Sequence, residues 1–375
     1  MIQQLTLENF KCFDKLELEI KPLTLITGRN GIGKSSILQS LLMLRQSFDE
    51  RFLQNDNQVL LNGELVNLLS GDAIRYAPSN SPDVNVSLEY ESDKNFSCSI
   101  KSDNPKELVK CSISGLDDIT SFALFADTFS YINAERLGPK TEYPKVLPTK
   151  TRHKGRLGTG SAELTASFLF SALSGNTPLP IKQLKHPDST SELLSLNVSA
   201  WLSEITYEGV QVTASEKTSE QVELRYSFDE FKGFTFSPLH VGFGFSYLLP
   251  VIVTVLSAKP GSLILIENPE AHLHPAAQTK IGMLLALAAG NGVQLIIETH
   301  SDHLLNGIRV MVKGNDKFGR VATENIITHF FTSAKEEESE KRYKETIKIY
   351  PTGQMDEWPV GFFDEWENNL NKIVF

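Results

Sequence analysis

Apolar and polar residues alternate through the first strand-like stretch of the chain, with apolar positions at Leu5, Leu7, Leu16 and Leu18. Alternation with a period of two is typical of strands that bury one face. Apolar residues with helical spacing follow over residues 35–46. We therefore predict two or three short strands, then a turn and a helix, at the start of the chain.

The middle of the chain contains more strand-like than helix-like segments. Residues 58–115 alternate again, and residues 210–215 and 222–228 have the pattern of a hairpin. Helical patches interrupted by glycine and proline are predicted within residues 120–175. Because glycine, proline and strand-type stretches recur through residues 50–235, this region does not fit a coiled coil.

The last third of the chain alternates apolar strands with helices. Residues 262–266 and 294–298 are apolar runs, typical of strands that are covered on both faces. Helical spacing is found in residues 245–256, 281–289 and 304–313. This alternation predicts an α/β fold.

A phosphate-binding motif lies between the first strands and the first helix. The segment GRNGIGKS, residues 28–35, fits GxxxxGK[ST], and we call it the P-loop. Glycines let backbone N–H groups curl around phosphate oxygens, and the helix N-terminus adds partial positive charge. Lys34 is expected to reach the β- and γ-phosphates and Ser35 to ligate Mg²⁺. We predict that ATP and Mg²⁺ bind to Arg29, Asn30, Gly31, Gly33, Lys34, Ser35 and Ser36.

An acidic residue ends the apolar run of residues 262–266. The stretch LILIENPEAHLHP places Glu267 after this run, and the carboxyl end of a parallel strand lies at the ligand edge of a sheet. We predict that Glu267 holds Mg²⁺ through a water molecule and that Ser35 ligates the ion directly.

The two residues that could activate water are Asn268 and Glu270. An amide takes no proton at neutral pH, but Asn268 can orient a water molecule. Glu270 can act as the base instead. Two interpretations stay open: slow turnover supported by Glu270 or Asn268, or ATP binding with barely any hydrolysis. We favour slow turnover, because a general base contributes only ~10²–10⁴-fold and the other phosphate-binding groups are present.

Two further features are expected to face phosphate. Gly242, Gly244 and Ser246 stand at the start of a predicted helix, where small residues suit an anion. His300 follows the apolar run of residues 294–298 and can reach the γ-phosphate.

The order of these motifs resembles the ABC-type ATPase heads of the SMC, RecF and OLD families. The opening LTLENFKCFDKLELEIKPLTLITGRNGIGKSSILQSLL is similar to their N-termini, IENPEAHLHP to their Walker B region and ETHSDHLL to their switch-histidine region. YINAERLGP and WPVGFFDEW resemble a bacterial subfamily of OLD-like ATPases. The specific motifs cover roughly residues 1–50 and 235–312.

This resemblance implies a single ABC-type P-loop head with a mixed-sheet core. One lobe would comprise residues 1–50 and 260–375, and a β-rich and helical inserted lobe would comprise residues 50–259. ATP would bind between two heads of a homodimer or higher oligomer.

In that dimer the turn of Gly242, Gly244 and Ser246 would cap the γ-phosphate bound to the partner, and His300 would be the switch histidine. The residue equivalent to the Gln-loop glutamine stays open among Glu135, Arg136 and the glutamines of residues 39–58.

The amino-acid composition limits which partners the protein is expected to bind and where in the cell it is expected to be found. The net charge is −10, with a pI near 5.4, which argues against a broad nucleic-acid footprint; residues 149–156 form one basic cluster. Cys12, Cys98 and Cys111 have no metal-binding spacing. With no export-signal pattern and no apolar run of ~18 residues, we predict a cytoplasmic protein without membrane contact. A zinc site at Glu270, His272 and His274 is a separate alternative.

The favoured function is an ATPase that dimerises on ATP and switches a partner effector, in antiphage defence or DNA-linked processing. Fewer residues follow Ser301 than a compact domain of ~100 residues needs, so a nuclease or toxin effector is expected on another chain. The alternative is a RecF-like, DNA-binding repair ATPase. An SMC clamp is disfavoured by the missing coiled coil, and a transporter ATPase by the N-terminal strand pair LTLENFKCF.

Overall fold

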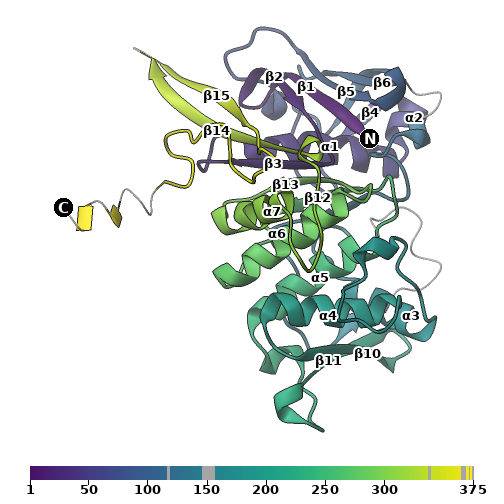
Figure 1. Ribbon diagram of the computed structural model, residues 1–375. Coiled ribbons are helices and arrows are strands. Elements are labelled where there is room, and N and C mark those ends of the chain that lie inside the picture. The colour runs from purple at the N-terminus through teal and green to yellow at the C-terminus, as the bar shows by residue number, and fades with distance from the viewer. Residues whose placement is uncertain (116–118, 146–156, 337–338, 365–368, 371, 374–375) are drawn as a thin grey trace. The chain divides into compact units, whose positions relative to one another are not determined.

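The computed structural model describes residues 1–115, 119–145, 157–336, 339–364, 369–370 and 372–373 (Figure 1). The helices are α1 (Lys34–Asp49), α2 (Phe52–Asp56), α3 (Thr165–Ser174), α4 (Leu194–Thr206), α5 (Phe243–Ser257), α6 (Pro275–Ala289) and α7 (Asp302–Lys313). The strands are β1 (Ile2–Phe10), β2 (Phe13–Glu19), β3 (Leu23–Gly28), β4 (Gln58–Leu60), β5 (Asp83–Tyr90), β6 (Asn95–Lys101), β7 (Leu108–Ser114), β8 (Ser130–Ile132), β9 (Tyr143–Pro144), β10 (Val210–Thr218), β11 (Gln221–Phe228), β12 (Leu263–Glu267), β13 (Gln294–Glu298), β14 (Ile326–Glu336) and β15 (Ser339–Ile347).

The chain forms two compact units that alternate along the sequence. Unit 1 comprises Met1–Phe125, Glu298–Asp302 and Ala322–Phe375, and unit 2 comprises Ala126–Ile297 and His303–Val321. These units are defined by internal packing. The lobes expected from the family resemblance, with boundaries near residues 50 and 260, remain a proposal.

An antiparallel sheet of unit 1 has the strand order β2-β1-β5-β6-β7-β4. Leu5 of β1 lies between Leu18 of β2 and Leu88 of β5, and all three side chains are buried. A register shift between β1 and β5 after Ile2 lets Ile2 and Leu5 both face the core despite their odd spacing. The β-rich segment predicted over residues 58–115 therefore extends the N-terminal strand pair.

The P-loop strand β3 also belongs to unit 1, where the strand order is β15-β14-β3. β14 runs parallel to β3 and antiparallel to β15, so the arrangement is mixed. α1 begins at Lys34, within the P-loop, and buries Leu38, Leu41 and Leu42. Its C-terminal end is anchored because Arg45 donates to the Leu124 carbonyl at 3.0 Å. Strand and helix thus hold the P-loop from both sides.

In unit 2 the strand order is β13-β12-β8, and β12 and β8 are parallel. Four of the five β12 residues are buried, as expected for a strand covered on both faces. The other sheet of unit 2, β10-β11-β9, packs against α3 and α4, which lie over it in Figure 1. This hairpin of β10 and β11 confirms the predicted one.

Two segments of unit 2 differ from the sequence predictions. Among the described residues of the range 120–175, the expected helical patches are limited to α3, apart from short single turns. β8 is a strand because its residues pair with β12. α4 was not predicted, although Leu194, Val198, Trp201 and Ile205 have helical spacing and are buried. Among the helices that the structure describes, none has the length and apolar character to cross a membrane.

Candidate nucleotide site

The P-loop adopts backbone conformations that only glycine accommodates easily. Gly28 has φ 139° and Gly33 has φ 110°. A Cβ atom at Gly28 would lie 2.1 Å from the Phe331 carbonyl oxygen, and one at Gly33 would lie 2.3 Å from the Cys12 sulfur. The glycines therefore allow both the turn and its close packing against β14 and the residues after β1.

Lys34 is the first residue of α1 and points back into the P-loop. Its Nζ donates to the carbonyl oxygens of Gly28 at 2.9 Å and Arg29 at 2.7 Å. Only 4% of Lys34 is exposed, and this burial lowers its pKa, while the charge of Glu298 opposes that change. The ammonium is thus held where the motif requires a phosphate-binding cation.

Ser35 is paired with an acidic residue that the sequence analysis did not select. Its Oγ donates to Oε1 of Glu298 at 3.0 Å, and Glu298 is the last residue of β13. Glu298 is buried. The available signal was an acid at the end of an apolar run, immediately before Thr299 and His300, which is the same signal that selected Glu267.

The predicted P-loop residues surround a cavity of about 670 Å³ in unit 1. The lining includes Asn30, Gly31, Gly33, Lys34, Ser35 and Ser36. Lys11 and Arg75 add two positive charges to that of Lys34, and Glu298 supplies the negative charge. Burial lowers the pKa of Lys11, whose Nζ donates to Gln39 at 2.6 Å. The cavity is therefore suited to an anionic ligand.

Arg29 and His300 line a second cavity of unit 1, of about 450 Å³. The Thr299 N–H donates to the Ile26 carbonyl at 3.1 Å, which holds His300 beside β3. Partial burial, followed by the positive charge of Lys34, lowers the pKa of His300. The imidazole is therefore neutral at pH 7.

The C-terminal motif WPVGFFDEW contributes to this second cavity through Phe362. The Phe362 side chain is fully buried, and its ring centroid lies 5.2 Å from that of Phe330 on β14. Residues 365 and 366 of the motif lie outside the described residues. The described part of the motif thus packs within the unit that contains the P-loop.

Glu267, in unit 2, is held by the motif YINAERLGP. Its carboxylate accepts from the Tyr131 hydroxyl at 2.9 Å and from the Ala134 N–H at 3.2 Å. Arg136 donates to the carbonyl oxygens of Glu267 at 2.6 Å and Asn268 at 2.9 Å. Burial raises the pKa of Glu267, and the hydrogen bond from Tyr131 opposes this rise. YINAERLGP therefore shapes the end of β12 and the turn after it.

Asn268 and Glu270 follow in this turn, close to Arg136. Asn268 has φ 44°, and its buried Oδ1 accepts no hydrogen bond from the described residues. Glu270 is 9% exposed. Burial lowers the pKa of Arg136 to about 10, and Glu270 is the strongest of the charges that oppose this decrease. Arg136 therefore stays protonated at neutral pH beside Glu270.

The zinc alternative at Glu270, His272 and His274 is not supported. His274 caps α6, because its Nδ1 accepts from the Ala276 N–H at 3.3 Å. The His272 ring lies against the ring of Tyr247, with centroids 4.4 Å apart. Within the part of the chain that the structure describes, these three residues are not among the groups with metal-binding spacing.

The turn that contains Gly242 and Gly244 packs against the turn that follows Asn268. A Cβ atom at Gly244 would lie 3.0 Å from the His272 carbonyl oxygen. Gly242 is the N-cap of α5 and is exposed, whereas Ser246 is buried. A role for all three residues in binding a partner's γ-phosphate remains a prediction. The basic cluster of residues 149–156 lies outside the described residues.

The comparisons with known proteins identify the fold. The chain has a TM-score of 0.54 with an SMC head bound to the C-terminal winged-helix domain of ScpA, at 13% identity, covering 92% of this chain and 97% of that one. An SMC head from Pyrococcus furiosus gives 0.53 at 12% identity, covering 100% and 99%. The fold is that of an ABC-type ATPase head. The predicted α/β class with a mixed sheet is therefore confirmed.

Family models match most of the ABC-type head. The model described as "AAA ATPase domain" matches residues 1–156, and the one described as "AAA domain, putative AbiEii toxin, Type IV TA system" matches residues 172–306. A model of a protein of unknown function matches residues 321–373. The models thus cover both the P-loop and the turn after β12.

Two curated proteins share part of the head. "Retron Vc95 probable ATPase" from Vibrio cholerae serotype O1 biovar El Tor is 33% identical over 104 residues, which is 26% of this chain and 18% of that protein. "Old nuclease" from Escherichia phage P2 is 32% identical over 84 residues, which is 21% of this chain and 14% of that protein. The chain thus matches under a fifth of either relative's length. The predicted resemblance to SMC and OLD ATPases is confirmed.

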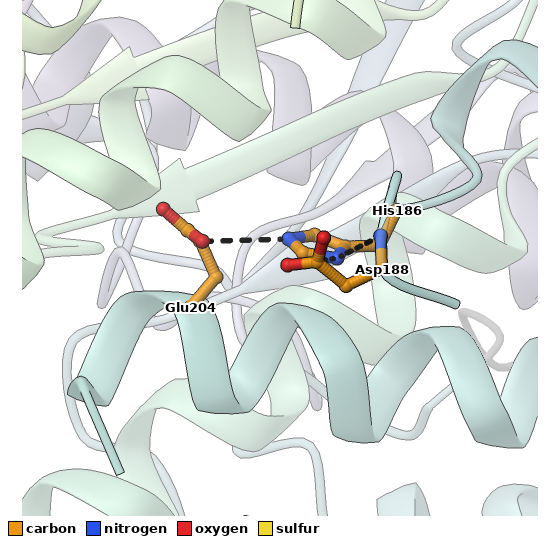
Figure 2. A group of neighbouring side chains, drawn as sticks. All are labelled: His186, Asp188 and Glu204. Carbon is orange, nitrogen blue, oxygen red and sulfur yellow. Dashed lines mark hydrogen bonds and ion pairs between the residues drawn. The ribbon is translucent and has the colours of Figure 1, made fainter. Parts of the chain in front are cut away.

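Unit 2 also contains a group with metal-binding spacing, His186, Asp188 and Glu204, which Figure 2 shows with the imidazole between the two carboxylates. Two ammonium groups already neutralise these carboxylates. Lys317 donates to Asp188 at 2.6 Å and to Glu204 at 2.8 Å, and Lys280 also donates to Glu204. The five residues therefore form a salt-bridge network that joins α4 and α6 to neighbouring loops.

This network is expected to make the folded state less stable as the pH falls into the acid range. Burial alone would raise the pKa of Glu204, but hydrogen bonds from Lys280 and Lys317 lower it to about 2. Its stabilising contribution is complete above the unfolded pKa, near 4.5, and is lost as the pH falls toward 2. Burial, then the charge of Lys317, lowers the pKa of His186, so stability is also lost as the pH falls below its unfolded value of 6.5.

We expect Glu204→Gln to lower the free energy of unfolding at pH 7 by about 1–3 kcal/mol, because hydrogen bonds to a charged group are lost. The variant should also lose less stability than the wild type between pH 4.5 and pH 2. Urea denaturation at several pH values measures both effects. Glu208→Gln, at an exposed position nearby, is the matched control. Equal stability of the two variants at pH 7 would contradict the role of this network.

Proposed function

We propose that the chain binds Mg-ATP at the P-loop, hydrolyses it slowly, dimerises on ATP and thereby switches a partner effector. The observation that carries this proposal is the cavity of unit 1, in which the P-loop, the buried Lys34 and the Ser35–Glu298 pair come together. Family models of AAA ATPases and the fold of SMC heads support nucleotide binding as the activity of this cavity.

The P-loop supplies three kinds of group for phosphate. Its glycines expose backbone N–H groups, and the N-terminus of α1 contributes the positive end of the helix dipole. Lys34 contributes a full charge; its hydrogen bonds to the carbonyls of Gly28 and Arg29 hold it in the loop until phosphate oxygens replace those acceptors. The same groups would stabilise charge that develops during phosphoryl transfer.

The oxygen donors near the P-loop fit Mg²⁺, which prefers hydroxyl, carboxylate and water ligands. Ser35 would hold the ion, and the motif resemblance assigns a further contact, through water, to Glu267. When bound, Mg²⁺ neutralises charge on the β- and γ-phosphates. Ser35 and Glu267 belong to different compact units, so the assignment of Glu267 rests on its place in the motif.

Water activation would involve the turn after β12. Asn268 presents a buried amide oxygen that can accept a hydrogen bond from water, and Glu270 presents a carboxylate that can accept a proton. Arg136 fixes the backbone of this turn and faces the charge of Glu270. We favour Glu270 as the base and Asn268 as a water-positioning residue, with His300 as the switch histidine beside the P-loop.

Dimerisation on ATP follows the same resemblance. The exposed Gly242 and the 47% exposed Phe243 start α5, so their backbone is accessible to a nucleotide bound by a second copy. Ser246 is buried in the described state, and its contribution to such an interface would require its exposure on ATP binding. Gly242 is therefore the better position for testing the interface.

The nature of the effector rests on the names of the relatives. One relative is named a retron ATPase and the other a nuclease, which makes antiphage defence or DNA-linked processing the favoured setting and a nuclease or toxin the favoured partner.

The alternative, a RecF-like DNA-binding ATPase, depends on the basic cluster of residues 149–156. A gel shift at stated salt concentrations distinguishes the two, because phosphate contacts weaken as salt rises.

The dimer is tested by sedimentation velocity with Mg-ATP and with Mg-ADP. We expect ATP to produce a dimer in the wild type, and Gly242→Asp to stay monomeric, because a carboxylate there would face the partner's phosphates. Asp suits an N-cap, so α5 should remain intact. Ser219→Asp, an exposed substitution of the same charge between β10 and β11, is the control and should dimerise.

Each part of the proposal can fail separately. A wild-type chain that binds ATP but stays monomeric would overturn dimerisation alone. A chain that binds no ATP in equilibrium dialysis, at any Mg²⁺ concentration, would overturn the nucleotide site itself.

A further inference from the structure

We propose that Glu298 is a metal-positioning residue of the nucleotide site: it orients the Ser35 hydroxyl toward Mg²⁺ and adds negative charge beside the ion. This inference rests on the proposed ATP-binding function. Glu298 lies outside the P-loop and outside the acidic strand end at Glu267, so it is an additional acid of this site.

The position of Glu298 relative to the P-loop is defined within one compact unit. Glu298 ends β13 but packs with unit 1, which also contains β3, the P-loop and α1. Its Oε1 accepts from the Ser35 Oγ at 3.0 Å, and 6% of the residue is exposed. A buried carboxylate in this place is costly unless it is paired with a hydrogen-bond donor or a cation.

The direction of the hydrogen bond matters for metal binding. A serine hydroxyl has one proton and two lone pairs. When a lone pair binds a cation, the proton must point to another acceptor, and the Glu298 carboxylate is already placed to accept it. Because the Ser35 proton points toward Glu298, the lone pairs of the Ser35 oxygen are available to ligate Mg²⁺.

The charge of the cavity supports the same role. Lys11, Lys34 and Arg75 line it together with Glu298, so it attracts phosphate overall. The negative charge of Glu298 by itself repels phosphate, so it weakens the binding of metal-free ATP. A divalent cation beside the phosphates reverses this effect, because carboxylates attract it. The carboxylate should thus favour Mg-ATP over free ATP.

Glu267 has a different set of contacts. Its two carboxylate oxygens accept from the Tyr131 hydroxyl and the Ala134 N–H, both in unit 2. Glu298, in contrast, accepts its hydrogen bond from the Ser35 hydroxyl within unit 1. An acid acting next to the metal-ligating hydroxyl typically contributes about 10–100-fold to metal affinity.

The test compares wild type, Glu298→Gln and Glu298→Asp by two binding measurements that do not depend on turnover. Electron paramagnetic resonance of free Mn²⁺ reports metal binding in the presence of ATP, and equilibrium dialysis in EDTA reports binding of metal-free ATP. We expect Glu298→Gln to bind Mn²⁺ about 10–100-fold more weakly. Its affinity for metal-free ATP should be equal to or greater than that of the wild type, and Glu298→Asp should regain part of the Mn²⁺ affinity.

A purely structural role for Glu298 predicts a different result, in which both measurements weaken together and Glu298→Asp regains neither. That result would overturn the inference, and so would unchanged Mn²⁺ affinity in Glu298→Gln. Glu89→Gln, an exposed change of the same charge on β5 that lines neither cavity, is the control and should match the wild type. If the wild type itself binds no ATP, the proposed function has failed rather than the role of Glu298.

Discussion

Lys34→Ala is expected to lower kcat/KM for ATP by about 10³-fold or more and to abolish detectable turnover. The ammonium of Lys34 is buried in the P-loop and donates to the carbonyls of Gly28 and Arg29, where phosphate oxygens would replace these acceptors. Charge-assisted hydrogen bonds of this kind contribute about 1.5–3 kcal/mol each, so ATP binding should also weaken at least about tenfold.

The measurement is phosphate release at saturating Mg-ATP, with ATP affinity determined separately by equilibrium dialysis. Because Lys34 also holds the P-loop together, the melting temperature of Lys34→Ala must be compared with that of the wild type. Lys313→Ala is the matched control, since this exposed lysine ends α7. If Lys34→Ala, free of contaminating ATPases, releases phosphate at the wild-type rate, turnover does not depend on the P-loop and the P-loop assignment is refuted.

Glu270→Gln is expected to lower kcat by about 10²–10⁴-fold while ATP affinity stays near the wild-type value. A glutamine keeps the shape of the side chain but cannot take a proton at neutral pH. Asn268→Ala should reduce kcat less, because it removes an amide that orients water and leaves the base in place. Single-turnover measurements at saturating Mg-ATP separate this chemical step from product release.

The structural effect of Glu270→Gln requires its own control. Arg136 is buried, and the charge of Glu270 favours its protonated form, so the substitution also leaves a buried cation less compensated. Glu270→Asp keeps the charge and should preserve the melting temperature. If Asn268→Ala abolishes turnover while Glu270→Gln retains it, water positioning is the main contribution and Glu270 is not the base. If no variant hydrolyses ATP but all bind it, the chain is an ATP-sensing switch.

Local patterns were sufficient for the P-loop and for the strands around it. A period of two identified β1 and β2, and the motif GRNGIGKS placed Lys34 and Ser35 at the start of a helix, as observed. These features depend on neighbouring residues only: side-chain alternation, the conformational freedom of glycine and the helix N-terminus. The same reasoning missed α4, because its core-facing residues are separated by serine and asparagine, which lower the helical signal.

Contacts between distant residues could not be predicted in this way. Glu298 had the same local signal as Glu267, an acid after an apolar run, yet their partners differ. Glu298 accepts a hydrogen bond from Ser35, and Glu267 accepts one from Tyr131. Ser246 was expected to face phosphate because it stands near a helix start, but the packing of α5 buries it. Residue spacing alone does not show which side chains of the first helical turn are covered by other elements of the fold.

The phosphate-binding loop, the α/β fold and the resemblance to SMC and OLD ATPases could all be recognised from the amino-acid sequence alone. Each of these follows from short-range patterns or from motif order. Only the tertiary structure paired Ser35 with Glu298 and joined Arg136 to the backbone of Glu267 and Asn268. Those contacts connect residues more than a hundred positions apart. They arise because strand pairing and the burial of apolar faces bring strand ends together, and no local pattern contains that information.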